Sequence, residues 1–458
     1  MNVKSLPWFF GLLAAILAAS VAVHLSLSQV IAVAIFSSFI LGTLFYWQFR
    51  LAFALIGATA LLSLKLIDIP HLIEFASVDI ILFLIAMMIV IGFLEERKFF
   101  EVLLEKLLDR ISHRPRWFFP SMMALAMLTA ALVDEVTSIL FMTSLTLHLT
   151  RRLKLDPFPY IVMIVLATNV GSSATVVGNP IGVLIALRAG LSFTDFLRWA
   201  TPISLAVLAL AIGICLLYFR GPLEEMAQGV GRVREKALEE GGVSRRQFRL
   251  AAWMFGITLA GLVLHHGVEH FLRLPKNTLL LGFPFFMAGV CLLIQGEKAR
   301  ELVEKRVDWW TLVFFLMLFA SVGTLRYVGV TDRIAEGLKS LAGSSPALLL
   351  ALILGISAVL TAFLDNILVV ATFIPIVSGL SASGVTVAPL WWALLFGGTL
   401  GGNATMIGST ANIVAMGMLE KEKHTVRFGQ WLGPGLAVTL PTLALAFFLL
   451  WIQLPLFK

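Results

Sequence analysis

The composition of this chain indicates a membrane protein. Its 458 residues are 59% hydrophobic and only 13% charged, whereas an ordinary soluble domain is about 25% charged. The net charge of +7 is not a sign of nucleic-acid binding, because the basic residues lie in short loops between apolar runs. Cys215 and Cys291 lie inside such runs and predict no disulfide framework. We therefore expect an all-α polytopic membrane protein.

Apolar runs divide the chain into spans. Residues 1–28 contain a long apolar run that is followed at once by further spans, so we interpret them as an extra transmembrane helix and not as a signal peptide. Together with two interrupted runs, the pattern predicts about 11 transmembrane helices and two re-entrant hairpins. The uninterrupted spans are expected at 8–27, 30–48, 51–69, 78–94, 202–219, 250–266, 277–295, 308–321 and 432–452.

The loop charges predict an orientation. If basic loops face the cytoplasm, Lys4, Arg50 and the segments 97–116, 151–154, 220–249 and 297–306 all fall on that side. The loops near Ser26 and Ile69 then fall outside. We expect a plasma-membrane protein whose longest polar loop, 220–249, is a cytoplasmic linker.

An acidic pair lies deep inside an apolar run. Asp134 and Glu135, with Thr137 beside them, are flanked by arms of about a dozen residues at 122–132 and 138–149. A spanning helix needs about 20 residues, so the pattern predicts a re-entrant hairpin at about 117–150. An acid in the membrane costs about 2.5–3.5 kcal/mol, which makes a functional role the default hypothesis. The alternative is a salt-bridged structural pair or an ordinary loop.

The second half of the chain repeats the first at an offset of about 230 residues. Asp134-Glu135 recurs as Asp365-Asn366 within a second predicted hairpin at about 345–381, and Asp79 recurs as Asp308. The repeats would occupy residues 29–219 and 250–458. Their hairpins enter the membrane from opposite sides in this orientation, as in the inverted repeats of secondary transporters. The other recurring runs are 171–178 with 401–408 and 196–202 with 428–434.

A polar, glycine-rich run interrupts a span after each hairpin, at about 158–187 and 388–417. Glycine and proline break a helix and free its carbonyls and amides. Unwound carbonyls with Ser, Thr and Asn oxygens suit Na⁺, and half-helix N-termini favour an anion. The alternative is close helix packing through small residues. The candidate ion-binding residues here are Asn169, Gly171, Ser172, Ser173, Thr175, Gly178 and Asn179, and Gly402, Asn403, Thr405, Gly408, Ser409, Thr410 and Asn412.

Hairpin tips, broken spans and inverted duplication together resemble the ion transporter superfamily. That group includes citrate-type carboxylate transporters, arsenite permeases, sodium–proton antiporters and the P protein. The run from Gly401 to Asn412 is most similar to the P-protein and arsenite-permease branch, and Gly178-Asn-Pro180 fits it. The resemblance implies an elevator-like motion and a homodimer.

The chain departs from one branch of that superfamily. Divalent-anion symporters carry Ser-Asn-Thr at each hairpin tip, where this chain has Asp134-Glu135-Val136 and Asp365-Asn366-Ile367. The acids favour sodium–proton antiport. Sodium- or proton-coupled transport of a small anion or oxyanion is the alternative, and a channel fits inverted hairpins less well. We expect no enzymatic activity, no cofactor beyond the coupling Na⁺ or H⁺, and no ATP drive, because the sequence contains no phosphate-binding loop.

Two further motifs have competing interpretations. His266-Gly-Val-Glu-His270 matches an inverted zinc-protease pattern, but it contains Gly267 at a predicted membrane edge, so interfacial polar residues are the simpler interpretation. Asp79 and Asp308 begin spans, where helix capping is the ordinary role. Arg188, near a span end, is expected to extend its charge to the interface.

Overall fold

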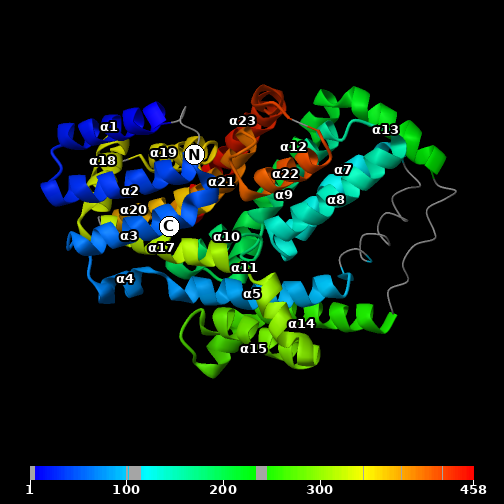
Figure 1. The fold of residues 1–458 in the computed structure, drawn as a ribbon, viewed down its shortest axis with the longest axis horizontal. Coiled ribbons are helices and arrows are strands. Elements are labelled where there is room, and N and C mark those ends of the chain that lie inside the picture. Colours follow the sequence, from blue (N-terminus) through cyan, green and yellow to red (C-terminus); the bar gives the residue numbers. More distant parts are fainter. Residues whose placement is uncertain are drawn as a thin grey trace.

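The computed structural model describes residues 6–99, 102, 115–233, 245–343, 345–382, 384–424 and 426–457. Within these ranges the chain is helical and forms no strand. Figure 1 shows the helices packed side by side in an elongated bundle, with α14 and α15 protruding along one edge. The expectation of an all-α polytopic membrane protein is confirmed.

The first half of the chain builds eleven of the helices used below. Their bounds are α1 (Leu6–Ala22), α2 (Leu27–Phe45), α3 (Arg50–Ser63), α4 (Ile69–Phe75), α5 (Val78–Glu96), α7 (Pro115–Leu132), α8 (Glu135–Leu153), α9 (Phe158–Ser172), α10 (Pro180–Ala189), α12 (Thr201–Tyr218) and α13 (Arg220–Val233).

The second half supplies the remaining helices. Their bounds are α14 (Arg245–Leu272), α15 (Thr278–Gln295), α16 (Ala299–Arg306), α17 (Trp309–Tyr327), α18 (Val330–Ala342), α19 (Pro346–Thr361), α20 (Asn366–Ala382), α21 (Ala388–Leu400), α22 (Thr410–Lys421) and α23 (Phe428–Gln453).

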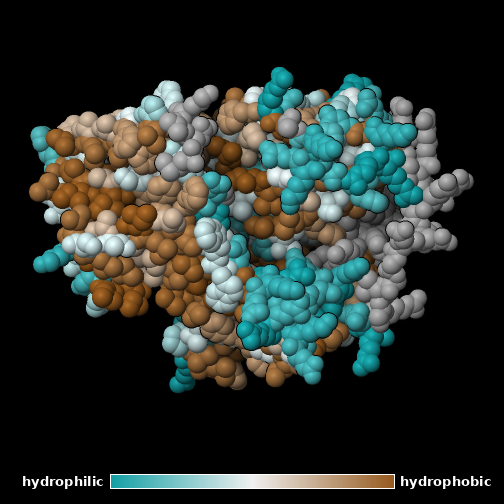
Figure 2. Space-filling view, in the orientation of Figure 1, coloured by the Kyte–Doolittle hydropathy of each residue, from teal (hydrophilic) through white to brown (hydrophobic). Residues whose placement is uncertain are grey.

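Seven helical segments in the described ranges are long and apolar enough to cross a membrane, by length and composition. Shorter apolar helices such as α9 and α19 accompany them. Apolar side chains cover much of the visible surface in Figure 2, while hydrophilic ones gather around α13. Much of the expected basic segment 97–116 and part of the loop 220–249 lie outside the described residues. The total of about 11 spans stays a prediction.

The centre of the bundle is formed by α9 and α21. Every residue from Tyr160 to Ser172 in α9, and from Pro389 to Leu400 in α21, is buried. Because these residues are buried on every side of the helix, neither stretch has a face for solvent or lipid. Each packs against the first arm of a hairpin, α9 on α7 and α21 on α19, so the core positions both tips.

Both predicted hairpins are present as helix pairs; the second occupies the range expected for it, whereas the arms of the first are longer than the expected dozen residues. The first pair, α7 and α8, has 18 and 19 residues, and the second, α19 and α20, has 16 and 17. The expected dozen counted only apolar residues. In α8 the hydroxyls of Thr146 and Thr150 donate to main-chain oxygens one turn back, so the helix continues through polar residues to Leu153. The prediction of about a dozen residues per arm was therefore wrong for the first hairpin.

Contacts of the first half recur in the second. The Thr175 hydroxyl donates to the main-chain oxygen of Ala131, and the Thr405 hydroxyl donates to that of Ala362. Gly171 lies directly against the backbone of Met127, and Gly401 lies in the same way against that of Ala358. The recurrence supports an internal duplication, whereas its boundaries at 29–219 and 250–458 stay predictions.

The two matched aspartates at span starts differ. Asp308 caps α17, because its carboxylate accepts the amide of Thr311 at 3.1 Å, as predicted. Asp79 is not the cap of α5, which follows Ser77. Its two oxygens instead accept the guanidinium of Arg188 at 2.9 and 3.1 Å. The expectation for Asp79 was wrong, because the sequence did not show that α10 ends beside it.

Candidate functional site

The tips of the two hairpins meet inside the protein. The side-chain amide of Asn366 donates to Oε1 of Glu135 at 3.5 Å, the long end of the hydrogen-bond range. Both residues are 1% exposed. They occupy equivalent positions in the two halves, so the duplication places one tip directly against the other, as the sequence predicts.

Each tip begins a helix with an aspartate cap. Oδ1 of Asp134 accepts the amides of Val136 and Thr137 at 2.7 and 2.8 Å, at the start of α8. Oδ1 of Asp365 accepts the amide of Ile367 at 3.1 Å, at the start of α20. Aspartate is a preferred N-cap, and its negative charge faces the positive end of the helix dipole. The sequence favoured a functional role for these acids, and the structure gives them a structural role as well.

The second carboxylate oxygens of Asp365 and Glu135 differ in their hydrogen-bond partners. Oδ2 of Asp365 accepts the Thr410 hydroxyl at 3.1 Å, which ties the second tip to α22. Oε2 of Glu135 is buried and has no hydrogen-bond partner among the described residues. Ser172 approaches the Glu135 carboxyl group, but its hydroxyl donates to the main-chain oxygen of Asn169 at 2.9 Å.

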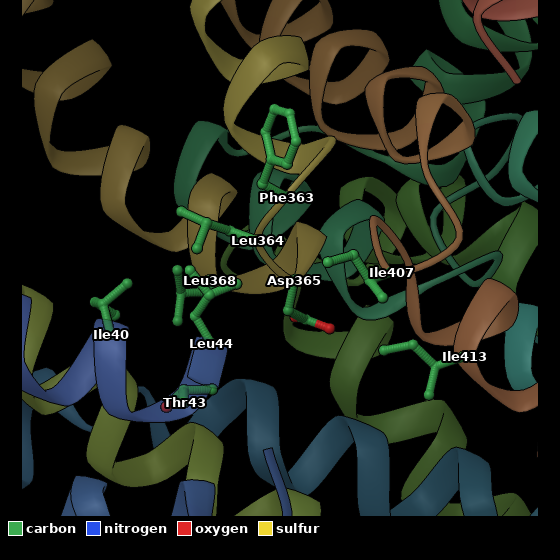
Figure 3. Close-up of a pocket in the computed structure, with 9 residues that line it drawn as sticks. All are labelled: Ile40, Thr43, Leu44, Phe363, Leu364, Asp365, Leu368, Ile407 and Ile413. Atoms are coloured by element: carbon green, nitrogen blue, oxygen red, sulfur yellow. The ribbon is translucent and has the colours of Figure 1, made fainter. Parts of the chain in front are cut away.

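A cavity of about 470 Å³ opens in front of the tips. Its walls also include α3, α5, α16 and α17. The predicted site residues that line it are Asp134, Glu135, Thr137, Asn179, Asp365 and Thr410. A second cavity of about 90 Å³ reaches Asp365 between α2 and the second hairpin, and Figure 3 shows this side chain among apolar neighbours such as Phe363 and Ile407.

Charges on the opposite wall of the large cavity were missed as site residues. The guanidinium of Arg306 binds Glu95 at 3.0 Å, and Lys305 binds Glu301 at 2.5 Å. Arg50 donates to the Thr311 hydroxyl at 2.9 Å and interacts electrostatically with Asp365 and Asp308. The sequence showed these cations only as loop charges, because nothing in it indicated that α3 and α16 face the tips.

The cavity follows only one half of α5. Side chains from Glu95 back to Phe83 line it. At the other end of the helix, Asp79 forms the salt bridge with Arg188 of α10. The cavity thus reaches the Glu95 end of α5 and stops short of the Asp79 end.

A buried amide network lies behind the cavity, where the two broken helices cross. The side-chain amide of Asn169 donates to Oδ1 of Asn403 at 2.7 Å and to Oδ1 of Asn412 at 2.8 Å. Ser409 donates to Oδ1 of Asn169 at 3.0 Å. The Asn412 amide donates to the main-chain oxygens of Gly402 and Thr405. These groups satisfy one another, which fixes the crossing.

Most predicted residues of the broken spans therefore lie behind the cavity and not in its wall. Both breaks are observed, between Ser172 and Pro180 and between Leu400 and Thr410. The predicted site residues that are buried and do not line the large cavity are Asn169, Gly171, Ser172, Ser173, Thr175, Gly178, Asn366, Gly402, Asn403, Thr405, Gly408, Ser409 and Asn412.

The motif His266–His270 has a structural explanation. The carboxylate of Glu269 accepts the amides of Asn277 and Leu279 at 3.2 and 2.7 Å, which ties the end of α14 to the start of α15. His266 and His270 are exposed. In the described ranges, no group of three His, Cys, Asp or Glu side chains could hold a metal ion.

Comparisons with known proteins agree with this fold. The family model described as "Citrate transporter" matches residues 39–397. The "Uncharacterized transporter Rv2684" of Mycobacterium tuberculosis is 32% identical over 87% of this chain and 92% of its own. The human "P protein" is 26% identical over 82% of this chain, which spans 54% of that longer protein.

A solved structure shares the fold. The Alcanivorax borkumensis YdaH transporter, described as having an unusual topology, aligns with a TM-score of 0.55 over 85% of this chain and 87% of its own, at 17% identity. The family match covers well over half of the sequence. This protein therefore belongs to the citrate transporter family and is a membrane transporter.

Proposed function

We propose that this transporter is driven by an ion gradient and exchanges a monovalent cation, most simply Na⁺, for protons. The observation that carries the proposal is the convergence of three carboxylates, Asp134, Glu135 and Asp365, at one end of one cavity. Carboxylates bind Na⁺ and H⁺ at the same oxygens. A site of this kind can therefore load one ion only after releasing the other, which is the requirement for exchange.

The charge distribution supports a cation as cargo. An anion that reached the tips would meet three carboxylates, and like charges in a partly buried site repel strongly. The Thr137 and Thr410 hydroxyls line the same cavity and can complete an oxygen shell. The nearby Arg306 and Lys305 are already engaged by Glu95 and Glu301, so they add little positive field.

A second candidate is sodium- or proton-coupled transport of a small anion or oxyanion. It is favoured by the name of the family and by Arg50, which lies in the cavity wall with the Thr311 hydroxyl. In that case bound cations would neutralise the tip acids before the anion enters. A homodimer, an elevator-like motion and a plasma-membrane location with the linker 220–249 in the cytoplasm complete the proposal.

The proposal is tested with purified protein in proteoliposomes that contain a pH-sensitive dye. Na⁺, Li⁺, K⁺, arsenite, citrate and chloride are offered in turn against the same buffer. Proton movement on addition of Na⁺ or Li⁺ without any particular anion is the expected result. Uptake of Na⁺ that requires citrate or arsenite would instead establish the anion symport.

A further inference from the structure

The three tip carboxylates are not equally occupied by protein groups. Asp134 receives two main-chain amides, and Asp365 receives one amide and the Thr410 hydroxyl. These bonds hold the helix starts and the contact with α22 in place. In both side chains Oδ1 is thus engaged at the start of a helix.

Glu135 differs from both aspartates because neither of its oxygens caps a helix. It is 1% exposed and lines the large cavity, but only its Oε1 receives a hydrogen bond, from Asn366. Its Oε2 is buried without a partner in the described structure. An ionised oxygen in that situation has lost its water and gained nothing in exchange.

Another buried glutamate of the same chain shows the usual arrangement. Glu269 is 2% exposed, and each of its two oxygens accepts a main-chain amide. This side chain holds two helices together, and both of its oxygens have a partner. The contrast indicates that the unpartnered oxygen of Glu135 is not simply a result of burying a glutamate here.

We infer that Oε2 of Glu135 is the oxygen that contacts the transported cation directly, with Asn366 orienting the carboxylate from the opposite tip. This inference rests on the proposed cation transport and names the ligand within that site. Asp134 and Asp365 then contribute mainly negative charge and a fixed frame.

Thermal unfolding of the full chain in detergent tests the assignment. NaCl, LiCl or KCl is titrated against choline chloride at constant ionic strength, with wild type, Glu135→Gln and Glu269→Gln. A cation that binds only the folded protein raises the Tm. We expect Glu135→Gln to need at least tenfold more cation for the same rise, with an ion-free Tm no lower than wild type, because Gln keeps the acceptor for Asn366 and removes the charge.

Glu269→Gln is the matched control, because it replaces a buried, satisfied glutamate. We expect a lower ion-free Tm and an unchanged cation response. An undiminished cation response in Glu135→Gln would overturn the assignment while leaving cation transport intact. A wild-type Tm that ignores all three cations, in a protein that transports only with an added anion, would overturn the proposed function and this inference together.

A separate observation concerns the closed end of the cavity. Phe83 of α5 and Val183 of α10 line the cavity. Asp79 and Arg188 lie on the same two helices, about 6 and 7.5 Å further along their axes. The two side chains form a bidentate salt bridge and are 39% and 33% exposed. Little more than one helical turn of α5 and of α10 therefore separates the cavity lining from the salt bridge.

We further propose that the Asp79–Arg188 salt bridge is the gate that closes this end of the transport path. A transporter must expose its site to each side in turn, and α5 and α10 would have to part here for the other side to gain access. The proposal depends on this chain being a transporter and not on the identity of its cargo.

Cysteine labelling in sealed vesicles tests the gate. Met88→Cys places a thiol in the cavity wall, and Cys215 and Cys291 are buried. A membrane-impermeant maleimide is applied from each side to this protein, alone and with Asp79→Asn. We expect labelling from the Asp79 side to rise severalfold in Asp79→Asn, and to return to the original level when the pair is exchanged as Asp79→Arg with Arg188→Asp.

Labelling from the Glu95 side reports whether each variant retains a folded cavity and should stay constant. Unchanged labelling from the Asp79 side in Asp79→Asn would overturn the gate. An exchanged pair that labels like the single variant would also overturn it, because the effect would then not depend on the salt bridge.

Discussion

At the first hairpin tip Asp134 is followed by a glutamate, and at the second tip Asp365 is followed by Asn366. The aspartates do the same work, since each caps the helix that leaves its tip. The residues that follow them have different roles. Glu135 has a carboxylate, whereas Asn366 has an amide that donates a hydrogen bond to this carboxylate. A duplicated frame thus holds an asymmetric site, in which the first tip has a second carboxylate and the second tip has the amide that donates to it.

The largest expected effect on stability comes from two glycines, one near each tip, that lie against the backbone of a hairpin arm. A Cβ at Gly171 or Gly401 would overlap the backbone of Met127 or Ala358. Overpacking of this kind costs about 1–3 kcal/mol or more. We expect Gly171→Ala and Gly401→Ala each to lower the Tm strongly and alike.

Gly355→Ala is the control for this pair. Gly355 lies inside α19, and a Cβ added there would have no other group within 4 Å, so alanine should preserve or slightly raise the Tm. A large loss in only one of the two tip variants would show that the halves do not share a frame.

The next largest loss of stability is expected when the side-chain hydrogen bonds of Thr175 and Thr405 are removed. Thr175→Val and Thr405→Val each remove a hydroxyl that donates to the end of a hairpin arm, at Ala131 and Ala362. A buried carbonyl left without a donor costs about 1–3 kcal/mol. Equal losses of stability, measured by thermal unfolding, are expected. Clearly unequal losses would show that the two threonine contacts are not equivalent in the two halves.

A smaller effect separates the capping role of Asp134 from its charge. Asparagine caps a helix about as well as aspartate, whereas alanine costs about 1 kcal/mol. Asp134→Ala should therefore lower the ion-free Tm, and Asp134→Asn should largely keep it while slowing coupled transport. Wild-type flux in Asp134→Asn would mean that the charge of Asp134 is not needed at the tips.

The arrangement of helices and tips could be predicted from sequence because the signal was repeated. The pair Asp134-Glu135 and its partner at Asp365-Asn366 lay in apolar runs at matched positions, and both breaks after them were found where expected. The polarity of Asn169, Asn403 and Asn412 was also visible, but not that they bind one another. The sequence could not show which face of a broken helix lines the cavity, because this depends on how the two halves pack against each other.

Residues contributed by distant helices could not be placed in this way. Arg50 follows an apolar run and resembles an ordinary loop cation, yet it lies in the same cavity as Asp365. The Asp79–Arg188 pair joins residues that are 109 positions apart. Neither pairing has a local pattern, because each depends on the packing of α3 or α10 against other helices.

Acidification gives the smallest expected effect. Protons and cations compete for the same tip carboxylates, so the rise in Tm caused by a fixed cation concentration should shrink as the pH falls, by mass action. Glu135→Gln should show little of this pH dependence. A cation-induced rise that is the same at neutral and acid pH would separate the cation site from the tip carboxylates.

Our main proposal for the site is that Glu135, whose counterpart at the second tip is Asn366, carries the exchanged ion. It is tested most directly by proton flux in proteoliposomes of wild type, Glu135→Gln and Glu269→Gln, prepared side by side and started by adding the transported cation. We expect flux in wild type and Glu269→Gln, and none above background in Glu135→Gln. Flux in Glu135→Gln at the wild-type rate would contradict it.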